Sequence, residues 1–207
     1  MVIIGINGKM GNKVYEFFKN SYEIIGVDKF PHEFVKTYKT LFDIKKFDIV
    51  IDFSSSSAID ELYYAVELNK IVISGTTGYN DEVIQDLKSR SNKFYWSCNY
   101  AKGIEIFKNI INIIKQHNEL KHFIEIHAST KLDAPSGTSK LLAKYLDVDE
   151  NKIQSIRLPH ATAKHEIIFT SNNERITIKH EIINYDAYLE GLKIKLEELI
   201  VCDKKII

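Results

Sequence analysis

The stretch Val2-Ile-Ile-Gly-Ile-Asn-Gly-Lys-Met-Gly11, at the start of the chain, decides the fold. Its first three residues form a short apolar run that ends in glycine, which is typical of a buried parallel strand. Three glycines with the spacing G-x-x-G-x-x-G then precede residues 12–20, where apolar residues recur at helical spacing. Such glycines permit a tight turn, close approach of a pyrophosphate and close packing of helix on strand. The stretch therefore predicts the opening of a dinucleotide-binding fold, with a simple tight turn as the alternative.

A second predicted strand, residues 24–27, ends at Asp28 and completes a strand–loop–helix–strand–acid unit. A carboxylate at this place accepts hydrogen bonds from the ribose hydroxyls of NADH and repels the 2′-phosphate of NADPH. The ammonium groups of Lys9 and Lys29 could instead pair with that phosphate, or they could be solvated surface charges. We therefore predict NADH or NADPH as the cofactor, with NADH favoured. The predicted contacts in this region are Gly5, Asn7, Gly8, Lys9, Met10, Gly11, Asp28 and Lys29.

Strands and helices alternate up to about residue 97, which predicts an α/β fold with a Rossmann-like, doubly wound parallel sheet. The further predicted strands are 48–53, 71–74 and 94–97, and the further predicted helices are 58–69 and 81–90. In such a sheet the loops after the strands line the ligand crevice. Gly75-Thr-Thr-Gly78 is therefore a candidate cofactor loop, with a plain turn as the alternative. The run Ser54–Ser57 could likewise be only a helix cap.

The pattern changes after about residue 99. The predicted elements there are a helix over 103–118, a strand over 122–127, a turn with a following helix, strand-like runs over 153–159, 164–170 and 175–183, and a closing helix over 186–201. Strands without helices between them favour antiparallel pairing in a mixed α+β unit. We predict a dinucleotide-binding domain, residues 1–99 and 187–207, with an inserted α+β substrate-binding and oligomerisation domain, residues 100–186.

The inserted segment carries the most specific chemistry between Glu125 and Ser139. It contains an imidazole (His127), an ammonium (Lys131) and the turn Pro135-Ser-Gly-Thr138 ahead of an apolar-periodic helix. A helix start offers free N–H groups and the positive end of a dipole to an anion. The lysine adds a full charge, and the histidine adds a proton donor near neutral pH. The segment therefore predicts a site for a small dianion, although a lone histidine or lysine is more often structural or on the surface.

The composition argues against several classes of protein. The 28 basic residues balance the 28 acidic ones, so no broad nucleic-acid surface or polybasic membrane anchor is expected. No apolar run approaches the roughly 20 residues that cross a bilayer, and the strand at the start leaves no room for a signal peptide. Cys98 and Cys202 lack C-x-x-C spacing and are expected to be reduced, in a cytoplasmic protein. His160, His165 and His180 have no clear metal-ligand spacing, so we assign no metal.

Together these motifs resemble the dihydrodipicolinate reductase (4-hydroxy-tetrahydrodipicolinate reductase) family of lysine and diaminopimelate synthesis. The resemblance covers essentially the whole chain, and its most specific part is Lys131-Leu-Asp-Ala-Pro-Ser-Gly-Thr138. The other matching motifs, in family order, are Gly5 with Lys9-Met-Gly11, Ile51-Asp-Phe-Ser54, Gly75-Thr-Thr-Gly78, Asn99-Tyr-Ala-Lys-Gly103, Glu125-Ile-His127, Arg157, His165 with Phe169, and His180 with Tyr188-Leu-Glu-Gly191.

The resemblance implies a reaction in which NAD(P)H delivers a hydride to C4 of an unsaturated cyclic imine that carries two carboxylates. The product is tetrahydrodipicolinate, and the protein supplies position, charge and a proton. His127 matches the proton donor of the family, and Lys131 matches the residue that holds a substrate carboxylate and polarises the ring. The implied clamp on a carboxylate consists of Ser136, Gly137 and Thr138.

The resemblance also implies cofactor contacts beyond the glycine loop. These are Phe53, Gly75, Thr76, Thr77 and Gly78 around the nicotinamide, and Asn99 near the hinge between the domains. It further implies a homotetramer, in which the β-rich insert pairs across subunits. The whole hypothesis requires the groups at 127, 131 and 137–138 to converge on one pocket that faces the reduced ring.

The chain departs from the family pattern at several points. Ala128 stands where a second histidine is usual, Lys9 replaces an arginine in the glycine loop, and Tyr185 stands where an arginine is common. The chain is also shorter than the common bacterial form, with the shortening between residues 28 and 97. Arg157 either helps to hold a carboxylate or braces the sheet. The alternatives are a non-catalytic NAD(P)H-binding homologue and a reductase of a related imine or semialdehyde.

Overall fold

The computed structural model describes residues 1–116 and 119–204, and the chain divides into two compact units. Unit 1 consists of Met1–Cys98 and Leu192–Ile207, and unit 2 consists of Asn99–Gly191. The sequence places the second boundary earlier, at 186/187, whereas one helix, α6 (Asp186–Lys204), crosses it. The start of α6 belongs to unit 2 because Gly191 packs directly on Tyr100. A Cβ added at Gly191 would lie 1.7 Å from the carbonyl oxygen of Tyr100.

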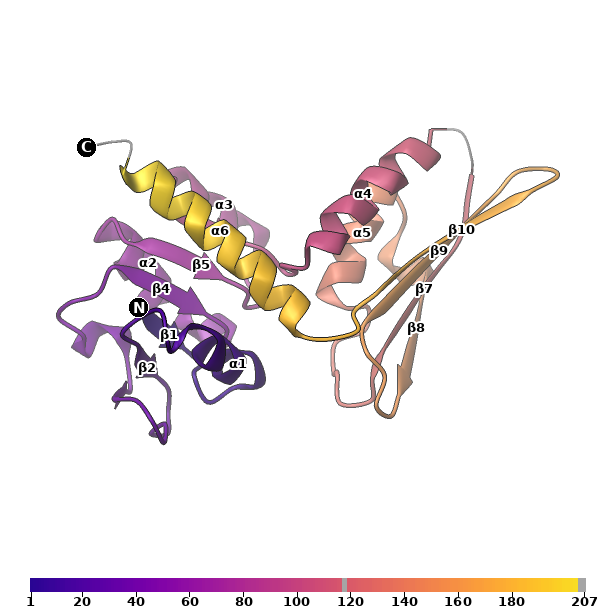
Figure 1. The fold of residues 1–207 in the computed structure, drawn as a ribbon. Coiled ribbons are helices and arrows are strands. Elements are labelled where there is room, and N and C mark those ends of the chain that lie inside the picture. Colours follow the sequence, from indigo (N-terminus) through magenta and orange to yellow (C-terminus); the bar gives the residue numbers. More distant parts are fainter. Residues whose placement is uncertain (117–118, 205–207) are drawn as a thin grey trace. The chain divides into compact units, whose positions relative to one another are not determined.

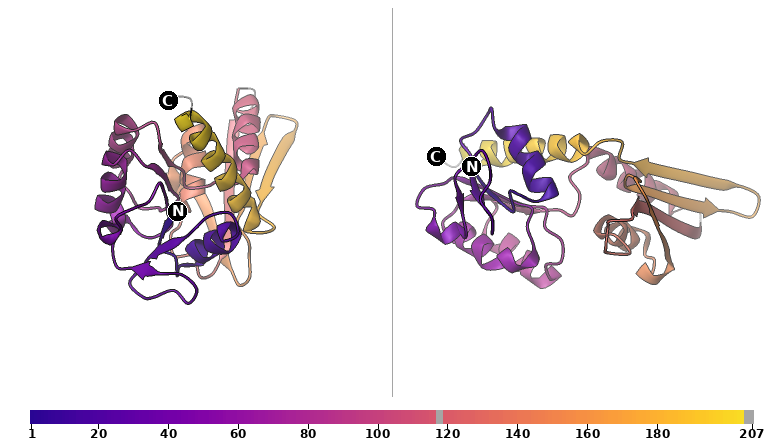
Figure 2. Two further views of the ribbon diagram at one scale, coloured as in Figure 1. Left: turned by 60° about the vertical axis from the view of Figure 1, so that its left-hand side comes forward. Right: turned by 90° about the horizontal axis from the view of Figure 1, so that it is seen from below.

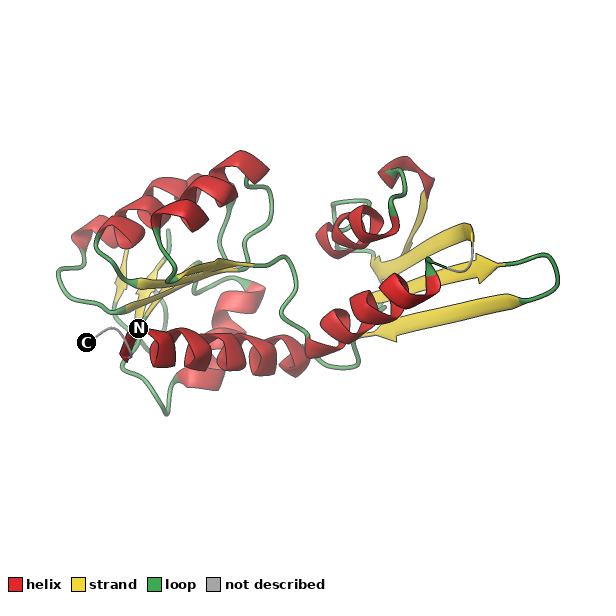
Figure 3. Cartoon of the chain, turned by 90° about the horizontal axis from the view of Figure 1, so that it is seen from above, coloured by secondary structure: helices red, strands yellow, loops and turns green. Residues whose placement is uncertain are grey.

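Unit 1 is built on a six-stranded sheet in the order β3-β2-β1-β4-β5-β6, in which all neighbours are parallel. Helices α2 and α3 cover one face of the sheet, and α1 and α6 cover the other (Figures 1 and 3). This arrangement confirms the predicted Rossmann-like, doubly wound fold. The strands are β1 (Val2–Ile4), β2 (Ile25–Val27), β3 (Thr37–Tyr38), β4 (Ile49–Asp52), β5 (Ile71–Ser74) and β6 (Phe94–Trp96). The helices are α1 (Lys9–Phe18), η1 (Leu41–Asp43), η2 (Ser56–Ala58), α2 (Ile59–Glu67) and α3 (Asp81–Arg90).

The elements of unit 1 follow the predicted pattern with two differences. Helix α1 begins at Lys9, directly after its N-cap Gly8, and so starts earlier than the predicted residue 12. Strand β3 was not predicted, because two residues are too few to show a period of two. It pairs with β2 at the edge of the sheet. The central strands β4 and β5 are buried at every residue, as expected for strands covered on both faces.

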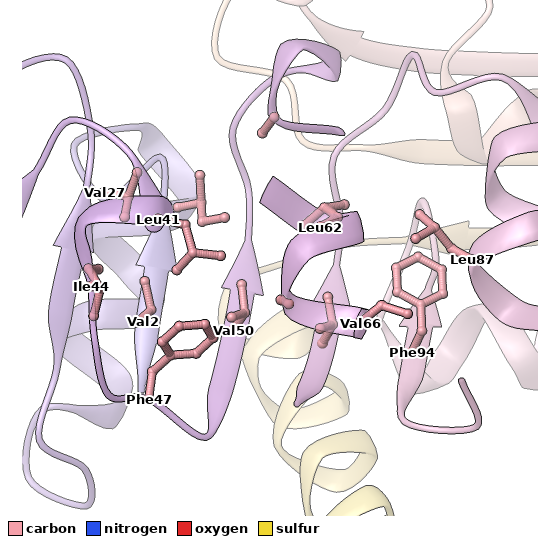
Figure 4. Packing of buried hydrophobic residues seen from close by; sticks show 14 of the residues in the cluster. Val2, Val27, Leu41, Ile44, Phe47, Val50, Leu62, Val66, Leu87 and Phe94 are labelled. Carbon is pink, nitrogen blue, oxygen red and sulfur yellow. The ribbon is translucent and has the colours of Figure 1, made fainter. Parts of the chain in front are cut away.

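A hydrophobic core joins the sheet of unit 1 to α2 and α3. Val2 and Val50 of the sheet pack with Leu62 and Val66 of α2 and with Leu87 of α3 (Figure 4). Burying one such side chain contributes about 1.5–3 kcal/mol. Because these contacts connect β1 and β4 to the helices, they fix the carboxyl ends of the strands, where the candidate cofactor residues lie.

Unit 2 contains a four-stranded mixed sheet in the order β10-β9-β7-β8. Strand β7 pairs parallel with β8 and antiparallel with β9. Strands β9 and β10 form an antiparallel hairpin, which Figure 2 shows as a long pair of strands. The predicted antiparallel pairing is therefore confirmed for β9 and β10, whereas it is wrong for β8, which lies at the far edge of the sheet and pairs parallel with β7. Residues 117–118 of the predicted helix over 103–118 lie outside the described residues. The elements are α4 (Lys102–Ile114), β7 (Glu119–Ala128), α5 (Gly137–Leu146), η3 (Glu150–Lys152), β8 (Ile153–Leu158), β9 (Lys164–Thr170) and β10 (Arg175–Glu181).

The two faces of this sheet differ. One face packs against α4 and α5 through a core that includes Phe107, Phe123, Leu142 and Ile167. The other face carries the alternate residues of the strands, and several of these are apolar and incompletely buried: Ile124, Ile126, Ile156, Leu158 and Ile168. Across the described ranges, no helix is both long enough and apolar enough to pass through a membrane.

Candidate active site

The glycine loop after β1 is a backbone structure that only glycine permits. Gly5 has a φ of +77°, and a Cβ there would lie 2.7 Å from the carbonyl oxygen of Phe53. A Cβ on Gly11 would lie 2.0 Å from the carbonyl oxygen of Gly5, because α1 packs directly on the loop. The N-cap residue of α1 is Gly8, which has no side chain that could cap the helix. The loop therefore presents a helix N-terminus in a form that suits a phosphate group.

A cavity of about 480 Å³ lies at the carboxyl ends of β1, β2 and β4, next to this loop. Its lining includes five of the predicted cofactor residues, Gly5, Gly8, Asp28, Lys29 and Phe53. The lining also includes Ser54, Ser55 and Ser57, from the run that the sequence left open between the ligand crevice and a helix cap. The sequence did not predict the other polar and aromatic lining residues, which are Lys39, Thr40, Phe42, Asp60 and Glu61. Lys39 and Thr40 lie between β3 and η1, and Phe42 lies within η1, in a stretch without a periodic pattern.

The carboxylate of Asp28 is fixed by backbone donors. Its Oδ2 accepts a hydrogen bond from the N–H of Asn7 at 3.0 Å, and its Oδ1 accepts one from the N–H of Phe30 at 3.3 Å. The side-chain amide of Asn7 donates to the carbonyl oxygen of Phe30 at 2.8 Å. These contacts tie the glycine loop to the turn after β2. Asp28 thus has a defined orientation and still has lone pairs that could accept from ribose hydroxyls.

A second buried carboxylate, Asp52, organises the ends of β4 and β5 and was missed by the sequence analysis. It is fully buried and accepts hydrogen bonds from the N–H and hydroxyl of Ser54, from the hydroxyl of Ser74 at 2.7 Å and from that of Tyr79 at 3.1 Å. Burial, together with the charge of Asp52, raises the pKa of Tyr79, which stays a phenol and a donor. Thr76 accepts from the N–H of Ser54 at 2.8 Å. The network therefore sets the geometry of the predicted loop over residues 75–78.

Phe53 and Gly75 are in close contact at this end of the sheet. A Cβ on Gly75 would lie 2.1 Å from the ring of Phe53, so the ring occupies the space that a side chain would need. Of the remaining predicted cofactor residues, Asn7 and Thr76 belong to the loops described above and are not among the residues that line the cavity. Lys9, Met10, Gly11, Gly75 and Thr77 do not line the cavity, and Asn99 belongs to unit 2.

In unit 2 the predicted substrate residues surround the N-terminus of α5. Ser136 is the N-cap, and its hydroxyl accepts from the N–H of Ser139 at 3.2 Å. The hydroxyl oxygen of Thr138 accepts a hydrogen bond at 3.0 Å from the side-chain nitrogen of Asn99. The side-chain oxygen of Asn99 accepts one from the N–H of Ala101 at 2.8 Å. Asn99 therefore connects the start of α4 to the start of α5, a position that the cofactor assignment did not anticipate.

A fully buried carboxylate, Glu125, lies behind this helix start. Its oxygens accept from the N–H of Ser136 at 3.0 and 3.1 Å, from the hydroxyl of Ser139 and from the guanidinium of Arg157 at 2.9 Å. Burial raises the pKa of Glu125, but these donors outweigh it and hold the pKa at about 2. Arg157 also donates to the carbonyl oxygens of Lys131 and Asp133. Arg157 therefore braces the sheet and the turn, which was one of its two expected roles.

His127 lies near the end of β7 with its imidazole 7% exposed. Its Nδ1 is 3.5 Å from Oε2 of Glu125. Burial lowers the pKa of His127; the charge of Glu125 raises it, and the cations Lys131 and Arg157 lower it further. The net effect is a pKa of His127 below the ordinary value. When no substrate anion is bound, the imidazolium therefore loses its proton at a lower pH than that of an ordinary histidine.

Lys131 forms an ion pair with Asp133, with 2.7 Å between Nζ and Oδ1. Burial raises the pKa of Asp133, but the hydrogen bond and charge of Lys131 and the backbone N–H of Gly137 lower it overall. Asp133 thus links Lys131 to the start of α5. In the same way, Glu125 links His127 to the start of α5. The structure brings these predicted groups together within unit 2. Their orientation toward a nicotinamide involves both units and stays a prediction.

Three histidines follow one another across this face of the sheet. The ring of His127 meets that of His165 edge to face at 5.5 Å between centroids, and His165 stacks with His180 at 5.9 Å. Burial, and then the neighbouring histidines, lower the pKa of His165 to about 3, so its ring is neutral. Glu125, His127 and His165 offer ligand atoms within 4.8 Å of one another. The adjacent guanidinium of Arg157 opposes a further cation, and we assign no metal to this cluster.

The fold of unit 1 and its glycine loop define the chain as a Rossmann-fold oxidoreductase. The family model for the dihydrodipicolinate reductase N-terminus matches residues 1–102, and the model for the C-terminus of the same family matches residues 103–205. The chain belongs to the dihydrodipicolinate reductase family. The predicted family and the predicted enzyme class, an NAD(P)H-dependent oxidoreductase, are therefore confirmed, and a non-catalytic homologue is not favoured.

Individual relatives agree with this assignment. The 4-hydroxy-tetrahydrodipicolinate reductase of Caldanaerobacter subterraneus is 30% identical over 90% of this chain and 89% of its own length. That of Carboxydothermus hydrogenoformans is 27% identical over 88% of this chain and 80% of its own length. A solved dipicolinate-bound dihydrodipicolinate reductase from Paenisporosarcina sp. TG-14 is similar in fold, with a TM-score of 0.76 at 21% identity, over 96% of this chain and 93% of that chain.

Proposed function

We propose that this chain reduces 4-hydroxy-tetrahydrodipicolinate to tetrahydrodipicolinate in lysine and diaminopimelate synthesis, with His127 as proton donor and Lys131 as carboxylate holder. The observation that carries the assignment of roles is the grouping of these two side chains around the N-terminus of α5. A helix start with a nearby ammonium suits a small dicarboxylate. The relatives named above carry the same activity in their names.

The residues of unit 2 divide the work on the substrate. Lys131 leaves Asp133 and pairs with one carboxylate of the substrate, and the N–H of Gly137 and the hydroxyl of Thr138 donate hydrogen bonds to the other carboxylate at the helix start. Asn99 donates to the oxygen of Thr138 and so leaves the hydroxyl proton to the substrate. Loss of water from the 4-hydroxy compound gives an unsaturated imine, and a nicotinamide held by unit 1 would supply the hydride to its C4. The resulting enamine takes up a proton from His127 at the neighbouring ring carbon.

Unit 1 is the proposed binding domain for the cofactor. The cavity beside the glycine loop fits the adenosine and pyrophosphate part, with Gly5, Gly8 and Asp28 as the principal contacts. The network of Asp52 supports the proposed nicotinamide contacts Phe53, Gly75, Thr76 and Thr77. Asp28 favours NADH, whereas Lys29 and Lys39, which line the same cavity, allow NADPH.

The first prediction concerns activity and cofactor choice. With freshly generated substrate, the protein is expected to oxidise both cofactors, with kcat/KM higher for NADH by up to about 10-fold, because Asp28 repels a 2′-phosphate. Loss of absorbance at the nicotinamide band measures both rates. Asp28→Ser should shift the ratio toward NADPH, while Asp60→Ser, another carboxylate of the cavity, should not. No reduction of the substrate with either cofactor would contradict the proposed function, and a large NADPH preference would contradict the role of Asp28.

A second prediction concerns assembly. We propose that the open face of the four-stranded sheet in unit 2 pairs with other copies of the chain, in a homotetramer. Ile156 and Leu158 are 39% and 47% exposed on this face. A patch of exposed apolar side chains often marks a surface that another protein chain covers. Light scattering after gel filtration should give about four times the mass of the 23.9 kDa chain. Leu158→Asp should lower that mass, whereas Ile113→Asp on the exposed side of α4 should leave it unchanged. A monomeric parent protein would contradict this assembly.

A further inference from the structure

We propose that Glu125 is the positioning residue for His127, and that its carboxylate holds the proton on Nδ1 of the imidazole so that Nε2 is the atom that donates. The inference rests on the proposed function, because it concerns the donor that the function requires. Glu125 itself has no contact with substrate in this scheme. It acts through the orientation and charge state of His127.

The carboxylate of Glu125 lies beside the imidazole of His127. Glu125 is the residue two places before His127 on the same strand, so both side chains point to the same face of the sheet. Oε2 of Glu125 lies 3.5 Å from Nδ1 of His127. Within the described residues, that nitrogen is buried and has no hydrogen-bond partner. A movement of a few tenths of an ångström would make the contact a hydrogen bond, and catalytic hydrogen bonds are often long before the substrate is bound.

The carboxylate of Glu125 is also fixed and charged. The N-terminus of α5, through Ser136 and Ser139, and strand β8, through Arg157, hold its two oxygens from different directions. With so many donors around it, the carboxylate stays ionised when buried. An ionised carboxylate only accepts hydrogen bonds. The nitrogen that faces it must therefore carry the proton, and in the neutral imidazole the opposite nitrogen is the free base.

Charged groups of both signs surround His127. The groups that face it are Glu125 on β7, Lys131 and Asp133 on the following turn, Arg157 on β8 and His165 on β9. Lys131 and Arg157 disfavour the imidazolium, and the ring of His165 is neutral. Asp133 is already paired with Lys131. Glu125 is therefore the principal group that makes a protonated His127 accessible, and a donor needs that form.

The experiment compares Glu125→Gln with Ser139→Ala. Glutamine keeps the shape of the side chain but removes its charge, whereas Ser139→Ala removes one hydrogen bond to the carboxylate and leaves the charge in place. Two readouts are followed: the pH at which kcat falls on the alkaline side, and the titration of His127 by NMR in protein with labelled histidine. Of the seven histidines, His127 is identified by its loss in a His127→Gln variant.

In Glu125→Gln both readouts are expected to move to lower pH together, by about one unit or more, and kcat at pH 7.5 should fall about 10-fold. In Ser139→Ala neither readout should move to lower pH, even if the melting temperature falls, because the charge of Glu125 is kept. A loss of stability in Glu125→Gln with unchanged titration and pH profile would overturn the inference, because that result describes a purely structural carboxylate.

A measurement on the parent protein covers the case in which Glu125→Gln does not fold. The ¹⁵N shifts of neutral His127 should show the proton on Nδ1, and a proton on Nε2 would overturn the inference. This outcome is independent of the proposed function. If His127 could be replaced without loss of activity, its proposed role as proton donor would fail, and if the parent protein did not reduce the substrate, the proposed function would fail; in either case the position of the proton would still be decided by the NMR result.

Discussion

The His127→Gln variant is expected to lose at least about 100-fold in kcat, while its dissociation constant for NADH stays at the parent value. Glutamine keeps a polar side chain but has no proton to give near neutral pH. The loss should fall on kcat rather than on KM, because the imidazolium acts on the transition state and not on the bound substrate. A 100-fold loss corresponds to about 2.7 kcal/mol of transition-state stabilisation.

Steady-state kinetics and quenching of NADH fluorescence measure the two quantities. His160→Asn is the control, since His160 is an exposed residue with a φ of +60° between β8 and β9, a conformation that asparagine tolerates. The control should keep parent activity. Full activity in His127→Gln would show that another group supplies the proton.

The pKa shift of His127 predicts the direction in which activity changes with pH. Burial lowers the pKa of His127 from its ordinary value of 6.5, and the cations Lys131 and Arg157 add to the effect against Glu125. A proton donor is active when protonated, so activity must fall as pH rises through the pKa. The fall in kcat/KM reports the free enzyme and is expected below about pH 6.5. A bound dianion raises the pKa, so the fall in kcat should lie at higher pH; the reverse order would contradict the role of His127.

The sequence was sufficient for features that depend on local pattern. The run Val2–Ile4 with its glycines predicted β1 and the helix that follows it, because a buried strand and a phosphate loop both show in consecutive residues; the first residue of α1 differed from the prediction. The turn at Ser136–Thr138 was likewise predictable as a helix start. The parallel order of unit 1 followed from the alternation of strands and helices.

The buried carboxylates were beyond reach because their partners are far away in the chain. Glu125 is bonded to residues 11, 14 and 32 positions later, and Asp52 to residues 22 and 27 positions later. No local pattern marks such a group. Arg157 illustrates the same limit: its two expected roles could be separated only when the structure placed Glu125 and the carbonyl of Lys131 beside it.

The departure at Ala128 also has a physical meaning that the sequence alone did not give. Side chains alternate along a strand, so Ala128, at the end of β7, points to the face opposite Glu125 and His127. A histidine at this position would begin on the open side of the sheet and not beside the Glu125 carboxylate. The retained His127 therefore keeps its own network without the second histidine.

The Lys131→Met variant is expected to lose about 100- to 1,000-fold in kcat/KM, equivalent to about 3–4 kcal/mol, with the affinity for NADH unchanged. Methionine keeps much of the length of the side chain but removes the charge that attracts a carboxylate. In the structure the ammonium is paired with Asp133, and the side chain is one-third exposed, so an incoming anion can reach it and compete for it. Because the same charge also lowers the pKa of His127, its removal should move the fall in kcat/KM to higher pH.

The two effects separate a substrate-binding lysine from a merely structural one. If Lys131 only anchored the turn through Asp133, then Asp133→Asn would damage activity as severely as Lys131→Met. If it holds the substrate, Asp133→Asn should be the milder change, because the ammonium is kept and loses only a competitor for the substrate carboxylate. Lys140→Ala, on the exposed side of α5 with its ion pair to Glu150, serves as the control and should leave kcat/KM unchanged. An Asp133→Asn loss equal to that of Lys131→Met would assign the lysine to the turn and leave the helix start as the carboxylate site.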